Sequence, residues 1–400
     1  MYIRGSAKII NQNYKTIKKN YLFTEINKKV EEFLQNSNKK VISLGVGDVS
    51  LPLDKNVVNV MQVALLSQTN KKSFVGYPPE CGYEFLKTAI KNYYKKRNVN
   101  LQNQEIFINN GACCDIGNIL DLFSHTTALV ADPTYPAYYD SNFLQGNNIQ
   151  FICANEQNNF CVSPENLTGK NYLIYLCSPN NPTGATLSKL QLKSWVDFAN
   201  STQSIIIFDC AYEMFIQDDS PHSIFEIQGA NTCCIEIASF SKMAGFTNIR
   251  CGWTVVPQSL YRDDCSLNQM WYRRQCSKFN GVPLFVQKGA EFVLSEQGLM
   301  SCKRKINYYK KNVTLIKNSL DKIGIKYLKS NNSPYVWLNC PKGYTSWEFF
   351  DFLLTKCQVV GIPGVGFGNS GEGYFRLSGF NTRQNTMLAC SRIQELYRIL

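Results

Sequence analysis

The sequence has very few histidines and no long apolar run, and each shortage excludes a class of protein. His125 and His222 are the only histidines in 400 residues, which leaves little for a zinc hydrolase or a Ser-His-Asp enzyme to use. No stretch reaches the roughly 18 to 20 apolar residues of a membrane span, and residues 1–20 lack the apolar core of a signal peptide. We therefore expect a soluble, cytoplasmic protein without a membrane partner.

Cysteine is abundant, with sixteen residues, but no C-x-x-C pair occurs. The vicinal pairs Cys113-Cys114 and Cys233-Cys234 are poorly placed for ordinary disulfides. In a chain of this length the pattern predicts reduced thiols in a reducing compartment rather than a disulfide framework. We expect no metal site.

The net charge of +12 raises the question of a nucleic-acid partner. The lysines, however, are scattered along the chain. The densest stretch, Cys302 to Lys317, has Ile306, Tyr309, Val313 and Ile316 at helical spacing with lysines between them. This spacing predicts an amphipathic helix with a solvated basic face, so we expect no nucleic-acid partner.

Short apolar runs between residues 105 and 242 predict a large α/β domain. They are apolar throughout rather than alternating, as expected for strands buried on both faces of a mostly parallel, wound sheet. Segments long enough for helices separate them. The runs are Glu105 to Asn109, Ala128 to Ala131, Tyr172 to Cys177, Ser204 to Phe208 and Cys233 to Ala238.

The character of the sequence changes near residue 290. A long amphipathic helix is followed by strand-like runs at Tyr335–Leu338, Cys357–Ile362 and Tyr374–Leu377, which predicts a smaller α+β domain. The N-terminal segment has its own amphipathic stretch, Phe23 to Phe33. We expect residues 52–289 to form the large domain, and residues 1–51 and 290–400 the small one.

In open α/β sheets ligands bind beyond the carboxyl ends of the strands. The residues that follow the predicted strands include a lysine, Lys242, in the run Ser239-Phe240-Ser241-Lys242. A lysine amine that forms a Schiff base with pyridoxal phosphate creates an electron sink for chemistry at an amino acid's α-carbon. Lys242 is therefore our candidate for the catalytic residue that carries this cofactor.

Asp209 follows a buried run and is the candidate partner of the cofactor's ring nitrogen, which a carboxylate keeps protonated. Tyr212 and Asn181 can both hydrogen-bond the phenolic oxygen of the ring. Taken alone, Asp209 is more often a turn or helix-cap residue, and Asn181-Pro182 marks only a turn.

The cofactor phosphate needs fixed donors. Ser239, Ser241 and Arg250 can supply them, together with backbone amides of Gly111-Ala112-Cys113. Tyr135 can stack on the ring, although a packing aromatic beside Pro136 is an equal alternative.

Arg376 lies among apolar neighbours, where an arginine needs an anion. A substrate carboxylate would serve, and so would an internal Asp or Glu.

Several of these motifs, in this order, resemble the fold-type I aminotransferases and, within them, the LL-diaminopimelate aminotransferase family. The resemblance extends from about residue 20 to the C-terminus. The motifs are Asn20-Tyr21-Leu22-Phe23, Leu44 to Asp48, Gly76 to Glu80, Asp132-Pro133-Thr134-Tyr135-Pro136, Ser178 to Gly184, Asp209-x-x-Tyr212, Ser239 to Lys242 with Arg250, Phe279-Asn280-Gly281, Asn332 to Tyr335 and Pro363 to Gly368.

The resemblance implies a homodimer with shared active sites, which use pyridoxal phosphate, an amino-acid donor and a 2-oxo acid. By motif match, Tyr77 would reach the partner's cofactor phosphate, and Glu80 and Asn280 the partner's substrate region. Positions expected to hold the substrate within one chain are Tyr21, Gly47, Tyr135, Asn181 and Arg376.

Two departures from the family pattern bear on the substrate. The family commonly has lysine where this chain has Cys113, and that lysine is expected to bind the charged distal end of the substrate. Pro78 replaces the usual glycine and removes a backbone donor near Tyr77. The resemblance implies transfer from LL-diaminopimelate to 2-oxoglutarate. A donor such as lysine, and more distantly a lyase reaction, remain alternatives.

Overall fold

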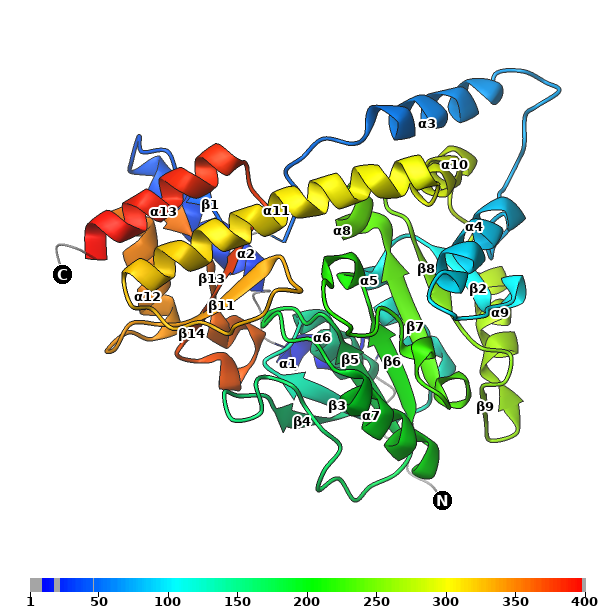
Figure 1. Cartoon of the computed structure of the whole chain (residues 1–400). Helices are drawn as coiled ribbons and strands as arrows, with labels where there is room; N and C mark the ends of the chain where they lie inside the picture. Colours follow the sequence, from blue (N-terminus) through cyan, green and yellow to red (C-terminus); the bar gives the residue numbers. More distant parts are fainter. Residues whose placement is uncertain (1–8, 18–21, 46, 398–400) are drawn as a thin grey trace.

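The computed structural model describes residues 9–17, 22–45 and 47–397. Its main feature is a seven-stranded sheet with the order β2-β8-β7-β6-β5-β3-β4 (Figure 1). The strands from β7 to β4 in this order run parallel, whereas β8 is antiparallel to both β2 and β7. The bounds are β2 Ile106–Asn109, β3 Thr127–Asp132, β4 Asn148–Cys153, β5 Tyr172–Cys177, β6 Ile205–Asp209, β7 Cys234–Ser239 and β8 Gly252–Val255.

Apart from the edge strand β4, the strands are largely apolar because each face of the sheet packs into its own hydrophobic core. Ile206 and Phe208 of β6 belong to one core, and Ile205 and Ile207 to the other, as the alternation of side chains along a strand requires. Helices α4 (Glu84–Lys95) and α7 (Lys189–Ser201) contribute to the first core. The second includes residues of α5 (Ala112–Asn118), α6 (Pro136–Gln145) and α9 (Leu267–Lys278).

The five predicted runs form β2, β3, β5, β6 and β7 with bounds within one residue, so that prediction is confirmed. The sequence did not predict β4 or β8. β4 is an edge strand whose side chains are exposed or half-buried, and it lacks a continuous apolar run. β8 begins at Gly252, where a Cβ atom would lie 2.5 Å from the Ala238 carbonyl oxygen. The glycine thus permits close approach of two strands where it would otherwise suggest a break.

The C-terminal part contains a three-stranded antiparallel sheet, β11-β14-β13. These strands are β11 Tyr335–Asn339, β14 Tyr374–Ser378 and β13 Ile362–Pro363. The single strand predicted over Cys357–Ile362 is wrong, since β12 (Val359–Val360) and β13 are separated by Gly361. A Cβ atom on Gly361 would lie 2.1 Å from the ring of Phe375, so the chain passes too close to β14 for a side chain.

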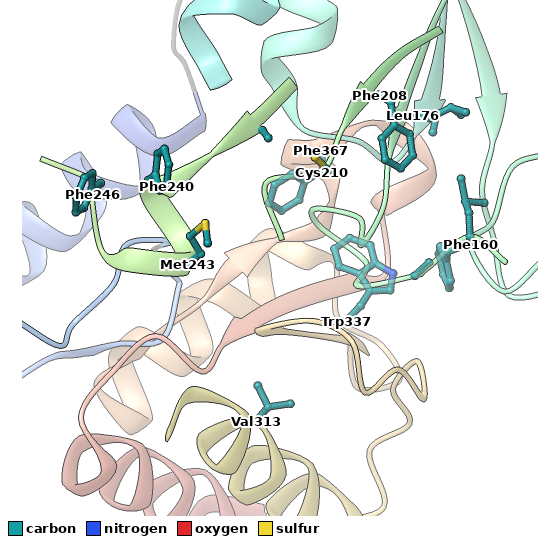
Figure 2. Packing of buried hydrophobic residues seen from close by; sticks show 14 of the residues in the cluster. Phe160, Leu176, Phe208, Cys210, Phe240, Met243, Phe246, Val313, Trp337 and Phe367 are labelled. Carbon is teal, nitrogen blue, oxygen red and sulfur yellow. The ribbon is translucent and has the colours of Figure 1, made fainter. Parts of the chain in front are cut away.

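The N-terminal segment packs beside this C-terminal part. β1 (Ile42–Ser43) pairs in parallel with β12, and Ile26 of α2 is buried in the same core as Val359. Trp337 and Phe367 of the C-terminal part also lie in this core, with ring centroids 6.1 Å apart (Figure 2). The core continues without interruption to the first face of the large sheet.

The long amphipathic helix is confirmed as α11 (Glu296–Lys322), on which Ile306, Tyr309, Val313 and Ile316 are buried (Figure 1). Further helices are α1 Asn13–Thr16, α2 Leu22–Gln35, α3 Lys55–Ser67, α8 Phe240–Ala244, α10 Leu284–Val293, α12 Ser346–Phe352 and α13 Arg383–Tyr397, and a small hairpin is made by β9 Tyr261–Arg262 and β10 Cys265–Ser266.

Other features predicted from composition concern cysteines, membranes and metals. All sixteen cysteines have free thiols. Within the described residues, no helix combines the length and apolar character of a bilayer span. The same residues contain no group of His, Cys, Asp and Glu side chains suited to hold a metal ion.

Candidate active site

A cavity of about 400 Å³ lies at the carboxyl edge of the parallel strands. β5, β6 and β7 end there at Cys177, Asp209 and Ser239. The cavity brings together most of the site residues predicted from the sequence. These are Gly47, Ala112, Cys113, Tyr135, Asn181, Asp209, Tyr212, Ser239, Ser241, Lys242, Arg250 and Arg376.

Lys242 lies in the short helix α8, which starts directly after β7 with Ser239 as its N-cap. The Ser239 hydroxyl accepts a hydrogen bond from the Ser241 backbone N–H at 3.1 Å. The Lys242 amine donates to the Gly47 carbonyl oxygen. Burial lowers the pKa of Lys242 to about 8, against the opposing influence of Asp48. A larger fraction of the amine is therefore neutral near pH 7 than for an exposed lysine, as a nucleophilic lysine requires.

Asp209 ends β6 and is 6% exposed. It accepts hydrogen bonds from the Tyr138 hydroxyl at 2.7 Å and from the Ala211 backbone N–H at 3.0 Å. Burial raises the pKa of its carboxyl group, while these donors and the Lys242 charge oppose the shift. Within the described residues no cation forms an ion pair with Asp209. A cationic group entering the cavity would stabilise this carboxylate.

Arg250, Ser239 and Ser241 form a polar corner of the cavity. The Arg250 guanidinium donates to the Thr247 carbonyl oxygen at 3.0 Å and to the Ser241 hydroxyl at 3.5 Å. It packs over Gly111, where a Cβ atom would lie 2.3 Å from Nη2, and Gly111 has a positive φ of 98°. Glycine is therefore required for both backbone and space. This corner concentrates donors for an anion.

The C-terminal sheet closes the other side of the cavity. Arg376 is 1% exposed and donates to the Asn181 side-chain oxygen and to the Gly45 carbonyl oxygen. Its guanidinium lies 4.3 Å from the ring centroid of Tyr335. The Tyr335 hydroxyl in turn is 2.7 Å from the Tyr212 hydroxyl. The acceptors in these two contacts are a side-chain amide oxygen and a backbone carbonyl oxygen.

Cys113 occupies the position after Ala112 at the start of α5 and is exposed to the cavity. The Tyr135 hydroxyl donates to its sulfur atom at 3.7 Å. The cations that line the cavity, among the residues that the structure describes, are Lys242, Arg250 and Arg376. The side chain that Cys113 contributes to the cavity is thus a thiol and not a further cationic group.

Comparison with known proteins gives this geometry a family. The model of the family "Aminotransferase class I and II" matches residues 39–393. This chain belongs to that family. It is 47% identical to the LL-diaminopimelate aminotransferase of Prochlorococcus marinus (strain MIT 9515), over 96% of this chain and 98% of the relative. Identity to the enzyme of the same name from Methanosphaera stadtmanae is 44%, over 97% and 98% of the two chains.

A solved structure agrees with this assignment. L,L-Diaminopimelate aminotransferase from Chlamydomonas reinhardtii superposes with a TM-score of 0.91 at 34% identity, covering 98% of this chain and 100% of that one. The fold is that of fold-type I enzymes. The chain is thus an aminotransferase that depends on pyridoxal phosphate and acts on amino and 2-oxo acids.

The cavity of this aminotransferase fits its cofactor. Asp209 is a buried carboxylate that forms no ion pair with another described residue, which suits a protonated ring nitrogen. The Ser239, Ser241 and Arg250 corner has the donors that a phosphate needs. Lys242, with its lowered pKa, lies in the same cavity. The donor set therefore agrees with pyridoxal phosphate in chemistry at each of its three polar ends.

Three predicted residues of the described chain do not line the cavity. Tyr77 is 86% exposed, and Glu80 and Asn280 are also exposed. The segments that carry them are in contact, because a Cβ atom on Gly281 would lie 2.7 Å from the Pro79 carbonyl oxygen. They form one surface of the aminotransferase, outside its own active site. Tyr21 lies outside the described residues.

Sequence reasoning missed other residues of the cavity. Tyr138 donates to Asp209, and Tyr335 contacts both Tyr212 and Arg376. The remaining unpredicted lining residues are Phe23, Ile116, Cys177 and Ala211. Tyr138 follows Tyr135 by three positions at the start of a helix, which places both on one face, and this spacing could have identified it. Tyr335 ends the Asn332 to Tyr335 motif, but its partner is distant in the chain.

Proposed function

We propose that this aminotransferase transfers an amino group from LL-2,6-diaminopimelate to 2-oxoglutarate, and that the resulting 2-oxo acid cyclises to tetrahydrodipicolinate. The observation that carries the proposal is the name shared by relatives that are 44% and 47% identical over nearly the full length of both chains. In this chain, Lys242, Asp209 and Arg376 lie in one cavity, where the proposed reaction requires them.

We assign the following roles in one subunit. Lys242 would hold the cofactor through its Nζ atom, and as a free amine the same atom would take the proton from the substrate α-carbon. Bound pyridoxal phosphate supplies the electron sink for that step. Asp209 holds the positive charge of the ring nitrogen, and Tyr212 and Asn181 hydrogen-bond the phenolic oxygen. Tyr135 stacks on the ring.

The remaining donors position the two charged ends. Ser239, Ser241, Arg250 and the backbone of Ala112 and Cys113 bind the phosphate. Arg376 binds the substrate α-carboxylate, because its guanidinium lines the cavity and a carboxylate can accept bidentate hydrogen bonds from it. Gly47 leaves room beside Tyr335, since a Cβ atom there would lie 2.6 Å from the Tyr335 hydroxyl.

We further propose that two copies form a dimer with shared active sites. Exposed apolar side chains gather on α3 and the segment after it, at Val63, Leu65, Leu66, Phe74 and Val75. Tyr77 is the next large exposed side chain along this segment. A second copy that covers this apolar surface would bring Tyr77, Glu80 and Asn280 to its own cofactor and substrate.

Complementation tests the dimer. Tyr77→Ala and Lys242→Ala variants should each be inactive or weak alone, and mixed subunits should regain activity because one of the two sites then has neither defect. A monomer in sedimentation at micromolar concentration, or no recovery in verified mixed dimers, would contradict shared sites.

We also propose that residues 52–289 form the large domain, and residues 1–51 and 290–400 the small domain, which the β1–β12 pairing supports.

A specific observation favours a second candidate function, in which the same reaction uses lysine or another amino-acid donor. If Arg250 and Lys242 bind the cofactor and Arg376 the α-carboxylate, no lining cation of the described chain remains for a distal carboxylate. Cys113 stands at the position where the family's lysine is expected to bind the distal end of the substrate. A donor without a distal carboxylate has no such requirement.

A donor screen with 2-oxoglutarate decides between these substrates. We expect wild type to use LL-diaminopimelate, and Cys113→Lys to lower its KM by up to about tenfold, the value of one charge-assisted contact. Cys113→Ala is the matched control, because it removes the thiol without adding charge. Efficient use of lysine with no turnover of diaminopimelate would refute the first proposal. If addition of pyridoxal phosphate produced no absorbance band that depends on Lys242, both proposed reactions would be refuted.

A further inference from the structure

Tyr335 touches two side chains of the active site that have separate roles. It lies on β11, where the register of the sheet pairs it with Ser378 of β14. Side chains two residues apart on a strand lie on the same face, so Tyr335 and Arg376 are diagonal neighbours on one face of this sheet. The Arg376 guanidinium carbon is 4.3 Å from the Tyr335 ring centroid, a distance at which the face of a ring attracts a cation. This ring thus helps to hold the arginine in place.

The hydroxyl group of Tyr335 makes a different contact. It lies 2.7 Å from the hydroxyl oxygen of Tyr212, which follows β6 of the large sheet. Tyr335 is 2% exposed and Tyr212 is 7% exposed. Burial raises the pKa of both phenols, so each keeps its hydrogen at neutral pH. One of the two hydrogens forms the contact between the oxygens, which leaves the other to donate to a third group.

Charged and titratable groups from four elements surround the two phenols. Arg376 of β14, Cys177 at the end of β5 and Asp209 at the end of β6 act electrostatically on the Tyr335 hydroxyl. Arg376 and Cys177 act on the Tyr212 hydroxyl as well. Lys242 of α8 lines the same cavity. A change confined to the Tyr335 hydroxyl leaves all four of these groups in place.

We propose that Tyr335 is a positioning residue for two parts of the reaction: its ring orients Arg376 toward the substrate carboxylate, and its hydroxyl donates to Tyr212. Tyr212 then keeps its own hydrogen for the phenolic oxygen of the cofactor. This inference rests on the roles assigned above to Arg376 and Tyr212. A hydroxyl that accepts one hydrogen bond is a stronger donor of another, because the bonds in a chain polarise one another. Tyr335 thereby strengthens the contact of Tyr212 with the cofactor, although it is not among the residues assigned to the cofactor.

The role of the hydroxyl is tested by absorbance. A pH titration of the visible absorbance of the cofactor-loaded protein gives the midpoint at which the nitrogen that joins Lys242 to the cofactor gains a proton. Negative charge on the phenolic oxygen holds that proton, and a donor to the oxygen weakens the hold, so Tyr335→Phe should raise the midpoint by at least about 0.3 pH units. Tyr374→Phe is the matched control and should leave the midpoint unchanged. It removes a hydroxyl of the same sheet that donates to Glu156, outside the cavity.

The role of the ring is tested by carboxylate binding. Glutarate has two carboxylates and no amine, so it can bind without reacting, and titration calorimetry with the cofactor-loaded protein measures its affinity. Tyr335→Leu removes the ring and should weaken binding about fivefold, whereas Tyr335→Phe keeps the ring face and should bind within about twofold of wild type. Arg376→Lys should weaken binding more than either, which assigns the probe to this arginine. If Tyr335→Leu does not fold, Tyr335→Met takes its place.

Each half of the proposal can fail separately. An unchanged or lowered midpoint in Tyr335→Phe overturns the role of the hydroxyl, since Tyr212 would then not depend on it or would itself donate to Tyr335. Equal affinity for glutarate in wild type and Tyr335→Leu overturns the role of the ring. So does glutarate binding that is undetectable in wild type or unaffected by Arg376→Lys. Neither measurement uses diaminopimelate or turnover, so failure of the proposed donor is a distinct result.

Discussion

Two neighbouring strands of the large sheet each bury a carboxylate, and the surroundings of the two carboxylates differ. Asp209 ends β6 on the face of the sheet shared by Ile205 and Ile207, and its cavity is open. Glu236 lies within β7 on the opposite face, next to Phe208, and is 0% exposed. A phenol donates to each carboxylate, from Tyr138 to Asp209 and from Tyr94 to Glu236.

The two carboxylates differ in the hydrogen-bond donors that the protein supplies to them. Glu236 also accepts from the Ser223 hydroxyl at 2.7 Å and the Ile224 backbone N–H at 2.8 Å, so it is satisfied by the protein alone. Among the described residues, Asp209 has one fewer donor than Glu236, and it faces space for a ligand. Burial raises the pKa of both. Burial of a carboxylate therefore does not identify a functional site, whereas an incomplete donor set beside a cavity does.

The sharpest test exchanges each carboxylate for its amide. Asp209→Asn removes the charge proposed to hold the protonated ring nitrogen, and kcat/KM should fall about 10²- to 10³-fold, the usual cost of one electrostatic contact at a reacting centre. Glu236→Gln is the matched control and should keep kcat/KM within about twofold at neutral pH. Steady-state rates at saturating cofactor measure both. Equal losses of activity in the two variants would show that the cavity does not distinguish Asp209.

The pH dependence of stability should report Glu236. Burial raises its pKa to about 7 from an ordinary value of 4.5. Between these values the folded state binds more protons than the unfolded state, so the free energy of unfolding falls as pH rises through this window. The total is about 3 kcal/mol. Urea unfolding at a series of pH values should show this decline in wild type and a flatter profile in Glu236→Gln. Parallel profiles would mean that Glu236 remains ionised when buried.

The large sheet was more predictable from sequence than the site was. β5 and β6 are apolar on both faces, and such runs follow directly from burial. Lys242, Asp209 and Arg250 follow strand ends or a motif, so the topology rule for α/β sheets gathers them. β8 was missed because Gly252 is required by a contact with Ala238 that no local pattern reveals.

Contacts between distant segments explain the other omissions. Tyr335 reaches Tyr212 across 123 positions of sequence, and Tyr138 reaches Asp209 across 71. When a tyrosine hydroxyl contacts a site residue from another element, the sequence around the tyrosine does not reveal the contact. Glu236 was missed for the same reason, since its donors come from Tyr94, Ser223 and Ile224.

Removal of the Tyr94 hydroxyl, which donates to the fully buried Glu236, should lower stability. The Tyr94 hydroxyl donates to Glu236 and accepts from the Trp253 indole at 2.9 Å, and both partners are buried. Tyr94→Phe leaves them short of a partner, so the free energy of unfolding should fall by about 1 to 3 kcal/mol. Urea unfolding at pH 7 measures this, with turnover of the folded variant as the control. An unchanged stability would indicate that water replaces the hydroxyl, and that this side is less enclosed than its contacts imply.

The matching change at Tyr138, whose hydroxyl donates to Asp209 beside the cavity, should affect catalysis instead. Tyr138→Phe removes one of the two donors to Asp209, which makes the ionised carboxylate less favourable and raises the pKa of Asp209 further. Protonation then begins at higher pH, so the acid limb of the kcat/KM profile should move to higher pH. The loss at neutral pH should be about tenfold, equivalent to one hydrogen bond to a charged group. A lower melting temperature with an unmoved pH profile would give Tyr138 the same structural role as Tyr94. In that case the cavity, and not the phenol, would be what separates the two carboxylates.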